Sequence, residues 1–200
     1  MKTLLLAGVA LAFATAGFAQ SQTTNTTQNQ PNTKSATLIS SGSEDIEFML
    51  DAAKGGLAEV ELGKLAAEHA QSDEVKKFAQ RMVDDHTKAN EQLKQIAESK
   101  SIKLPTDVDT KDKTLMQRLE KLNGAAFDRT YMNAMVNDHM KDVNEFKREA
   151  NGGRDPQVKS FATSTLPTLE EHLQQAKQAR GTASPRTSSA AKPPATSGNN

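Results

Sequence analysis

Each of the four histidines in this sequence directly follows an acidic residue, and two of them stand in nearly identical phrases. MVDDH at residues 82–86 returns as MVNDH at residues 135–139. Neutral imidazole nitrogens bind zinc, copper, iron and nickel, so three histidines brought together would hold one transition metal ion. The three histidines that are candidate ligands, each with the acid before it, are Asp85-His86, Asp138-His139 and Glu171-His172.

A carboxylate could complete such a site, and the stretch GLAEVELG at residues 56–63 offers Glu59 and Glu61. Both are candidate ligands beside the three histidines. Neighbouring residues on a helix point about 100° apart, so the acid before each histidine is expected to support the ligands rather than bind the metal. The expected supporting residues are Asp85, Asp138, Glu171 and Tyr131.

The elements that must position these side chains are helices, because apolar residues recur with a period near 3.6 along most of the chain. After Ser72, a residue type favoured as an N-cap, one apolar stripe includes His86 and runs to about Ser99. A second stripe includes His139 and ends at Gly152-Gly153, which favour a helix end.

Two further helices flank these. Asp155 and Pro156 favour the start of the helix that carries His172, and Pro167 inside it predicts a kink or break. The first helix is expected from about Asp45 to His69, and its small residues predict close contact with a neighbouring helix. These small residues include Gly56 and Gly63.

Between the second and third long helices, a connection of about 25 residues is predicted to hold a short helix at residues 114–122. The sequence does not tell whether this connection crosses the bundle or folds back locally. Four long helices with two tight turns and one long connection predict an all-α, ferritin-like four-helix bundle with a short extra helix.

The histidines fall near the middle of this predicted bundle. His86 and His139 lie ~21–22 Å from the nearest turn at 1.5 Å per residue, and His172 lies ~28 Å from it, about one turn off level. A shared metal site would require ring nitrogens no more than about 5 Å apart, because metal–nitrogen bonds are about 2.0–2.1 Å long.

The two ends of the chain differ from this domain in composition. Residues 1–19 resemble a secretory signal peptide with cleavage near Ala19, which predicts a periplasmic or secreted protein. The polar residues 20–43 and the Ser/Pro-rich residues 181–200 are predicted to be disordered, which leaves residues 44–180 as the helical domain. No segment of the mature chain is expected to span a membrane.

Charge and cysteine content narrow the classes of function. The chain has 25 basic and 25 acidic residues, and removal of residues 1–19 takes away one lysine. This near-neutral balance gives no electrostatic support for nucleic-acid binding. Without cysteine, the protein has no disulfide, no thiolate nucleophile and no thiolate metal site.

The domain resembles the bacterial exported family called "domain of unknown function 4142", which is placed among the ferritin-like bundles. The similar stretches cover nearly all of residues 45–180: GGLAEVELGKLA, FAQRMVDDHTKAN, LPTDVD, GAAFDRTYMNAMVNDHMKDVNEF and TLPTLEEHL. The resemblance implies a fold and an exported location but no activity. The chain contains no Glu-x-x-His, so it lacks the di-iron signature of ferritin-like proteins.

Two functions are therefore compatible with the sequence. One is an envelope scaffold, for example in stress responses, that binds a protein or a small molecule and uses a buried histidine layer to fix helix register. The other is a metal-binding or metal-dependent redox protein that uses His86, His139 and His172. The sequence shows no nucleophile elbow or phosphate loop, so the first interpretation, a protein that is not an enzyme, is favoured.

Overall fold

Five α-helices make up the part of the chain that the structure, a computed structural model, describes. This part is residues 33–183, with side chains described for residues 42–182. The predicted signal peptide and most of the predicted C-terminal tail lie outside it. The helices are α1 (Thr33–His69), α2 (Asp73–Ser99), α3 (Thr110–Leu119), α4 (Gly124–Gly152) and α5 (Pro156–Ala183).

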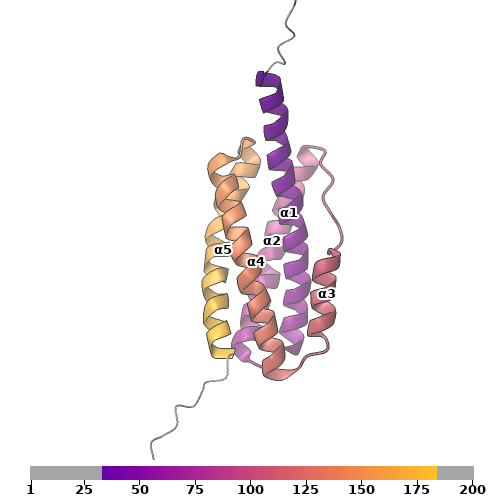
Figure 1. The fold of residues 1–200 in the computed structure, drawn as a ribbon, viewed down its shortest axis with the longest axis vertical. Helices are drawn as coiled ribbons and strands as arrows, with labels where there is room; N and C mark the ends of the chain where they lie inside the picture. The colour runs from indigo at the N-terminus through magenta and orange to yellow at the C-terminus, as the bar shows by residue number, and fades with distance from the viewer. Residues whose placement is uncertain (1–32, 184–200) are drawn as a thin grey trace, which may run out of the picture.

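The four long helices pack as two antiparallel pairs, α1 with α2 and α4 with α5 (Figure 1). The connection after α2 runs back along the outside of the bundle and carries α3, so that α4 starts beside the α1–α2 turn (Figure 1). Therefore α2 and α4 run in the same direction, and the long connection crosses the length of the bundle. The predicted ferritin-like four-helix bundle with an extra helix is confirmed.

Two buried aspartates accept hydrogen bonds from the backbone of the two tight turns, and each aspartate lies on the opposite helix pair. Asp128 on α4 accepts the backbone N–H groups of Gln71 and Ser72, each at 2.9 Å. Asp45 on α1 accepts those of Arg154 and Asp155 at 3.1 and 2.8 Å. These bonds satisfy N–H groups that a helix start would otherwise leave unpaired.

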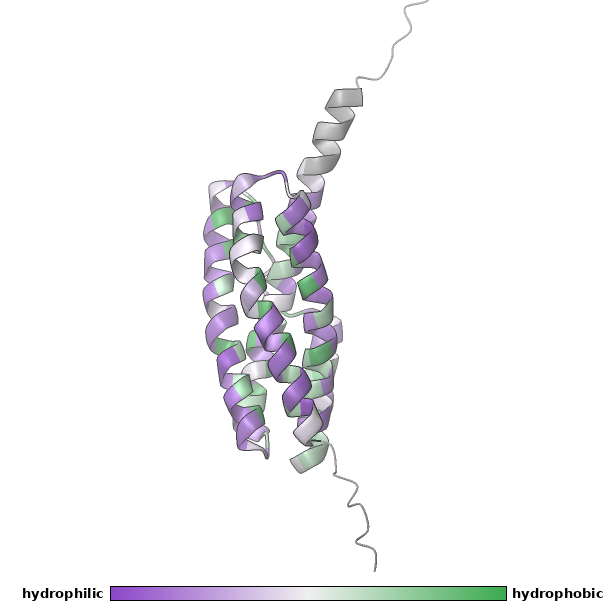
Figure 2. Ribbon diagram, turned by 90° about the vertical axis from the view of Figure 1, so that its left-hand side faces the viewer, coloured by the Kyte–Doolittle hydropathy of each residue, from purple (hydrophilic) through white to green (hydrophobic). Residues whose placement is uncertain are grey.

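The apolar interior consists of two clusters, one toward each end of the bundle. The cluster nearer the α1–α2 turn includes Leu62, Met82 and Val136, and the other includes Ala53, Leu93 and Val143. Along the helices, hydrophilic and hydrophobic residues alternate as the amphipathic pattern requires (Figure 2). The space between the two clusters is where buried polar residues can gather.

Close packing of α1 on α2 depends on two glycines. A Cβ at Gly63 would lie 2.9 Å from Val83 Cγ2, and one at Gly56 would collide with the Asn90 side chain. The predicted close contact along these small residues is confirmed. This approach brings the middle of α1 within reach of the middle of α2.

Several predicted boundaries differ from the structure. The first helix begins at Thr33 instead of about Asp45, so the end of the segment predicted to be disordered is helical. Helix α3 spans Thr110–Leu119 instead of residues 114–122, because Asp109 caps it by accepting the N–H of Asp112 at 2.9 Å. Pro167 lies inside α5 without ending it, so of the predicted kink or break, the break is absent. No helix in the described part is long and apolar enough to cross a membrane.

Candidate metal centre

Each of the four long helices contributes one buried polar residue to a layer at mid-bundle: Glu59 from α1, His86 from α2, His139 from α4 and His172 from α5. On every helix this residue falls between the members of the two apolar clusters. His139 and His172 are 0% exposed, and Glu59 and His86 are 4% and 5% exposed. We call these four residues the histidine layer.

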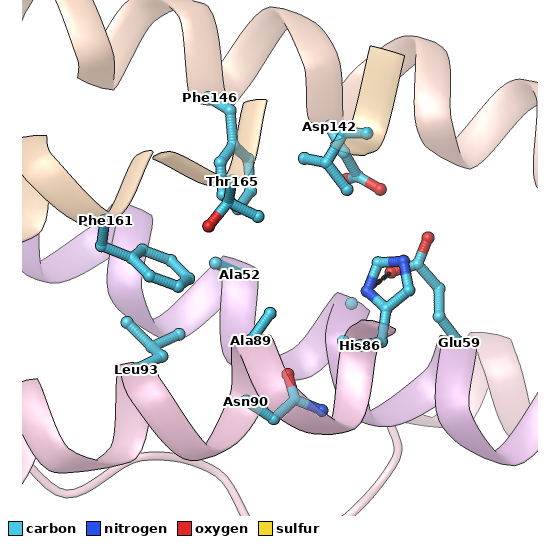
Figure 3. A pocket seen from close by; sticks show the side chains of 13 residues that line it. Ala52, Glu59, His86, Ala89, Asn90, Leu93, Asp142, Phe146, Phe161 and Thr165 are labelled. Atoms are coloured by element: carbon cyan, nitrogen blue, oxygen red, sulfur yellow. Dashed lines mark ion pairs between the residues drawn. The ribbon is translucent and has the colours of Figure 1, made fainter. Parts of the chain in front are cut away.

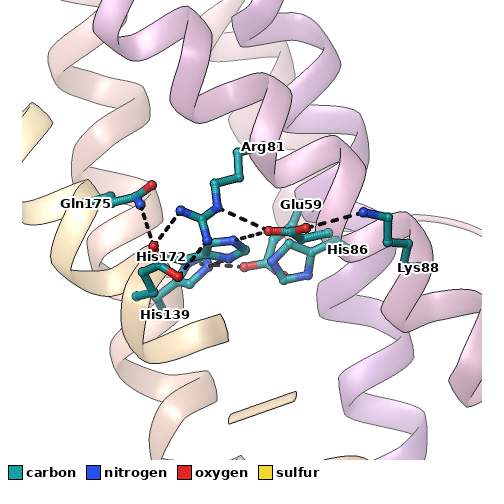
Figure 4. Close-up of polar contacts among 9 residues, drawn as sticks. Glu59, Arg81, His86, Lys88, His139, His172 and Gln175 are labelled. Carbon is teal, nitrogen blue, oxygen red and sulfur yellow. Dashed lines mark hydrogen bonds and ion pairs between the residues drawn. The ribbon is translucent and has the colours of Figure 1, made fainter. Parts of the chain in front are cut away.

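The three imidazole rings contact one another, and Figure 4 shows them grouped in the interior. Their ring centroids are 5.4–5.6 Å apart, and one nitrogen of each ring lies within 4.8 Å of one nitrogen of each of the others. The separation meets the 5 Å criterion set by metal–ligand bond lengths. The sequence-based estimate placed His172 about one turn off level, and the structure brings its ring into contact with the other two.

Hydrogen bonds fix which nitrogen of His139 and of His172 carries hydrogen. His139 Nδ1 lies 3.0 Å from the Met135 carbonyl oxygen, which can only accept, so Nδ1 is the donor. His172 Nε2 lies 3.0 Å from Asp85 Oδ2 and donates to it. In the neutral rings, the unprotonated nitrogens are then His139 Nε2 and His172 Nδ1, and these two atoms are 3.4 Å apart.

The third ring is oriented by the layer's carboxylate. His86 Nδ1 lies 3.0 Å from Glu59 Oε2, and the bond leaves His86 Nε2 as the unprotonated nitrogen. His86 Nε2 is buried and has no hydrogen-bond partner among the described residues. All three histidines thus have one nitrogen fixed by an acceptor and one lone pair available, which is the arrangement that metal-binding histidines usually show.

The electrostatics of the layer favour the neutral form of His139 and His172 and the ionised form of Glu59. Burial lowers the pKa of His139, and burial with the neighbouring His86 lowers the pKa of His172 to about 4. Burial alone would raise the pKa of Glu59, but interactions with His86 and His139 outweigh it and hold this pKa below its usual range. At neutral pH, His139 and His172 therefore present lone pairs, which a cation can accept.

A network extends from His172 to the surface. Burial opposes ionisation of Asp85, but hydrogen bonds from His172 and Arg81 lower its pKa. Arg81 Nε lies 3.2 Å from Asp85, and its other nitrogens form two hydrogen bonds to Glu171 at 2.8 and 2.7 Å (Figure 4). Asp85 thus holds the tautomer of His172, and Arg81 holds Asp85.

The other predicted site residues lie outside this layer. Glu61 forms an ion pair with Lys64 at 2.7 Å on the outer side of α1, and Asp138 lies 3.7 Å from Lys111. Glu171 is exposed and reaches the histidines only through Arg81. Tyr131 is fully buried, but its hydroxyl has no hydrogen-bond partner among the described residues, so it does not orient a histidine.

One acidic residue near the layer was not predicted. Asp142 on α4 has a carboxylate oxygen within 4.8 Å of ligand atoms of Glu59 and His139. Burial, followed by repulsion from Glu59, raises its pKa to about 9. The pattern His139-x-x-Asp142 places both residues on one helical face, so the sequence did contain a signal for it.

A small cavity adjoins the layer on the side of the second apolar cluster (Figure 3). It measures about 20 Å³ and is lined by Glu59 and His86 together with apolar side chains such as Leu93, Phe146 and Phe161. A water molecule needs at least about 10–15 Å³, so the cavity has room for about one water or a diatomic molecule beside the histidines.

Comparison with known proteins adds the family and the fold. Residues 24–179 match the family model described as "Domain of unknown function (DUF4142)". No curated protein matches the chain.

Two solved structures share the fold at low sequence identity. A DUF305 fragment from Deinococcus radiodurans is 13% identical with a TM-score of 0.62, over 70% of this chain and 96% of that one. A DUF305 protein from Streptomyces coelicolor, whose description proposes that it is secreted, is 14% identical with a TM-score of 0.61, over 70% and 92%. At these identities the likeness concerns the fold alone.

Proposed function

The chain belongs to the DUF4142 family, whose description assigns no activity, and we propose from the site itself that this protein binds one transition metal ion through His86, His139 and His172. The observation that carries the proposal is the contact between His139 Nε2 and His172 Nδ1 at 3.4 Å. Because the other nitrogen of each ring carries the hydrogen, these two nitrogens each have a free lone pair and can only accept hydrogen bonds. Two acceptors facing each other in a dry interior repel unless a cation lies between them.

The spacing supports the same conclusion. Two imidazole nitrogens bound to one tetrahedral ion at about 2.0–2.1 Å are about 3.3 Å apart, close to the separation seen here. The unpaired His86 Nε2 is the third donor, and it lies in a ring already oriented by Glu59. Each of the three histidines has a ring nitrogen within 4.8 Å of a ring nitrogen of the other two, which supports a three-histidine set.

The donor set indicates the class of metal. Three imidazoles without a thiolate suit zinc, copper, nickel or iron and leave a further coordination position open, as catalytic zinc sites do. Glu59, Asp85 and the Met135 carbonyl act from outside by holding the three rings in the binding tautomer. When bound, the ion would supply Lewis-acid or redox chemistry beside the small cavity.

We also propose that the protein works in the cell envelope or outside the cell. The support is the signal-peptide pattern of residues 1–19, which lie outside the described residues, together with the secretion proposed for the Streptomyces relative. Because the chain has no cysteine, a metal in this protein would be bound without a thiolate ligand.

The test is Co²⁺ titration of the chelator-treated protein, followed by visible absorption and by metal analysis. We expect one Co²⁺ per chain in the wild type and at least tenfold weaker binding in His172→Gln, a loss of about 1.4 kcal/mol or more. Glu59→Gln should also weaken binding, because it removes the acceptor that orients His86.

Glu61→Gln is the matched control, since Glu61 lies two positions from Glu59 on the same helix and pairs with Lys64. It should leave Co²⁺ affinity unchanged. Substoichiometric Co²⁺ in the wild type, with His172→Gln only less stable, would instead show that the histidines serve helix register.

A further inference from the structure

A pocket of about 180 Å³ lies between α1, α3 and α4, on the outer side of Glu59 from the histidines. Six carboxylates and three lysines line it. The acids are Asp51, Glu59, Asp109, Asp112, Asp138 and Asp142, and the lysines are Lys54, Lys111 and Lys141. The lining is therefore rich in oxygen atoms that can bind a cation.

The lysines do not neutralise the inner part of this pocket. Lys54 pairs with Asp51 at 2.9 Å, Lys111 lies 3.7 Å from Asp138, and Lys141 pairs with Glu145 at 3.4 Å. Neither Glu59 nor Asp142 forms an ion pair with a lysine or arginine of the described chain. These two acids are the innermost of the lining, and their oxygens lie within 4.8 Å of each other.

One oxygen of Glu59 provides independent evidence of a missing partner. Glu59 Oε2 receives the hydrogen bond from His86, but Glu59 Oε1 is buried and receives none from any described residue. His139 Nδ1 lies 3.3 Å from Oε1, but its hydrogen is directed to the Met135 carbonyl at 3.0 Å. A buried carboxylate oxygen without a donor is costly, and here it belongs to a side chain that lines the acidic pocket.

We propose that Glu59 Oε1 and Asp142, with Asp138 beside them, bind a second cation in this pocket. All the donors are carboxylate oxygens, and the pocket is wide enough to keep several waters on the ion. This combination suits a hard divalent ion such as Mn²⁺, Mg²⁺ or Ca²⁺. Glu59 then orients His86 with one oxygen and binds this cation with the other.

The second site does not depend on whether the histidines hold a metal. Its ligands are oxygens on α1 and α4, whereas the histidine site uses nitrogens on α2, α4 and α5. The ligand sets differ in hardness, so ions can be chosen that prefer one or the other.

The test is Mn²⁺ titration monitored by electron paramagnetic resonance, in which the signal of free Mn²⁺ falls on binding. We expect the full chain to bind one Mn²⁺ and Asp142→Asn to bind it at least tenfold more weakly. Asp138→Asn, a second variant, should also weaken it. Asp84→Asn is the matched control, because Asp84 is an exposed aspartate bonded only to Gln80.

His172→Gln separates this proposal from the first. Mn²⁺ affinity should be retained in this variant, while Co²⁺ affinity falls. The proposal is overturned if Asp142→Asn, with an unfolding curve like that of the wild type, binds Mn²⁺ as the wild type does. Equal loss of Mn²⁺ in His172→Gln and Asp142→Asn would also overturn it, because that result means one shared site.

Discussion

The buried aspartates at the two turns and the buried Glu59 of the histidine layer differ in how completely they are paired. At the turns, both oxygens of Asp128 and both oxygens of Asp45 accept a backbone N–H from the opposite helix pair. In the histidine layer, Glu59 uses one oxygen on His86, and among the described residues neither its other oxygen nor His86 Nε2 has a hydrogen-bond partner.

This difference separates structural polar groups from those open to a ligand. A buried polar group that serves only the fold is normally satisfied within the protein, because an unpaired one costs about 1–3 kcal/mol. The turn aspartates meet this expectation. The histidine layer does not, although it lies between two well-packed apolar clusters that could have closed over an apolar layer. Its unpaired atoms are those that a bound cation would satisfy.

The largest effect on stability is expected at a turn. Asp128→Ala would leave the N–H groups of Gln71 and Ser72 without their partner and should lower the free energy of unfolding by about 2–4 kcal/mol. Urea unfolding measures it, with Asp84→Ala as the exposed control. The folded variant should still bind Co²⁺. A loss equal to that of the control would remove the distinction between the two kinds of carboxylate.

A second prediction concerns acid sensitivity in the histidine layer. The pKa of His172 is lowered to about 4, whereas an unfolded histidine titrates near 6.5. Between these values the unfolded chain binds the proton and the folded protein does not. Acidification through this window therefore destabilises the wild type, by up to about 1.4 kcal/mol per pH unit.

His172→Gln should lack this contribution. The measurement is urea unfolding of metal-free wild type and variant at several values between about pH 4 and pH 7. We expect the stability difference between the two proteins to shift in favour of the variant as pH falls. Parallel pH profiles would mean that His172 takes up its proton as readily in the fold as outside it.

The smallest effect should come from Glu61→Gln. Glu61 and Lys64 form an exposed ion pair one turn apart, and such pairs contribute about 0.3–0.5 kcal/mol. Unfolding free energy should change by no more than this. A larger loss, or a change in Co²⁺ affinity, would show that the layer extends to the outer side of α1.

The choice between Glu59 and Glu61 illustrates what sequence can predict about a site. The depth of both residues along the helix follows from the rise per residue, so both were reasonable candidates. Which one faces the histidines depends on how α1 is rotated against α2. That rotation is set where Gly63 meets Val83 and Gly56 meets Asn90, which are contacts between different helices.

Hydrogen bonds between residues far apart in sequence could not be predicted either. Asp128 bonds a turn 57 residues away, and Asp45 bonds one 109 residues away. His172 reaches Asp85, 87 residues earlier, although the acid beside it in sequence is Glu171. The chain crosses over between α2 and α4, and only the assembled bundle brings these groups together.

The sequence by itself determined the helices, the bundle, and the burial of three histidines, because the apolar period and the capping residues act within a few positions along the chain. The tertiary structure decided that the three rings contact one another, that Glu59 and not Glu61 joins them, that Asp142 lies next to Glu59, and which nitrogen of each ring faces an acceptor. These depend on the rotation and stagger of one helix against another, which packing between distant segments sets.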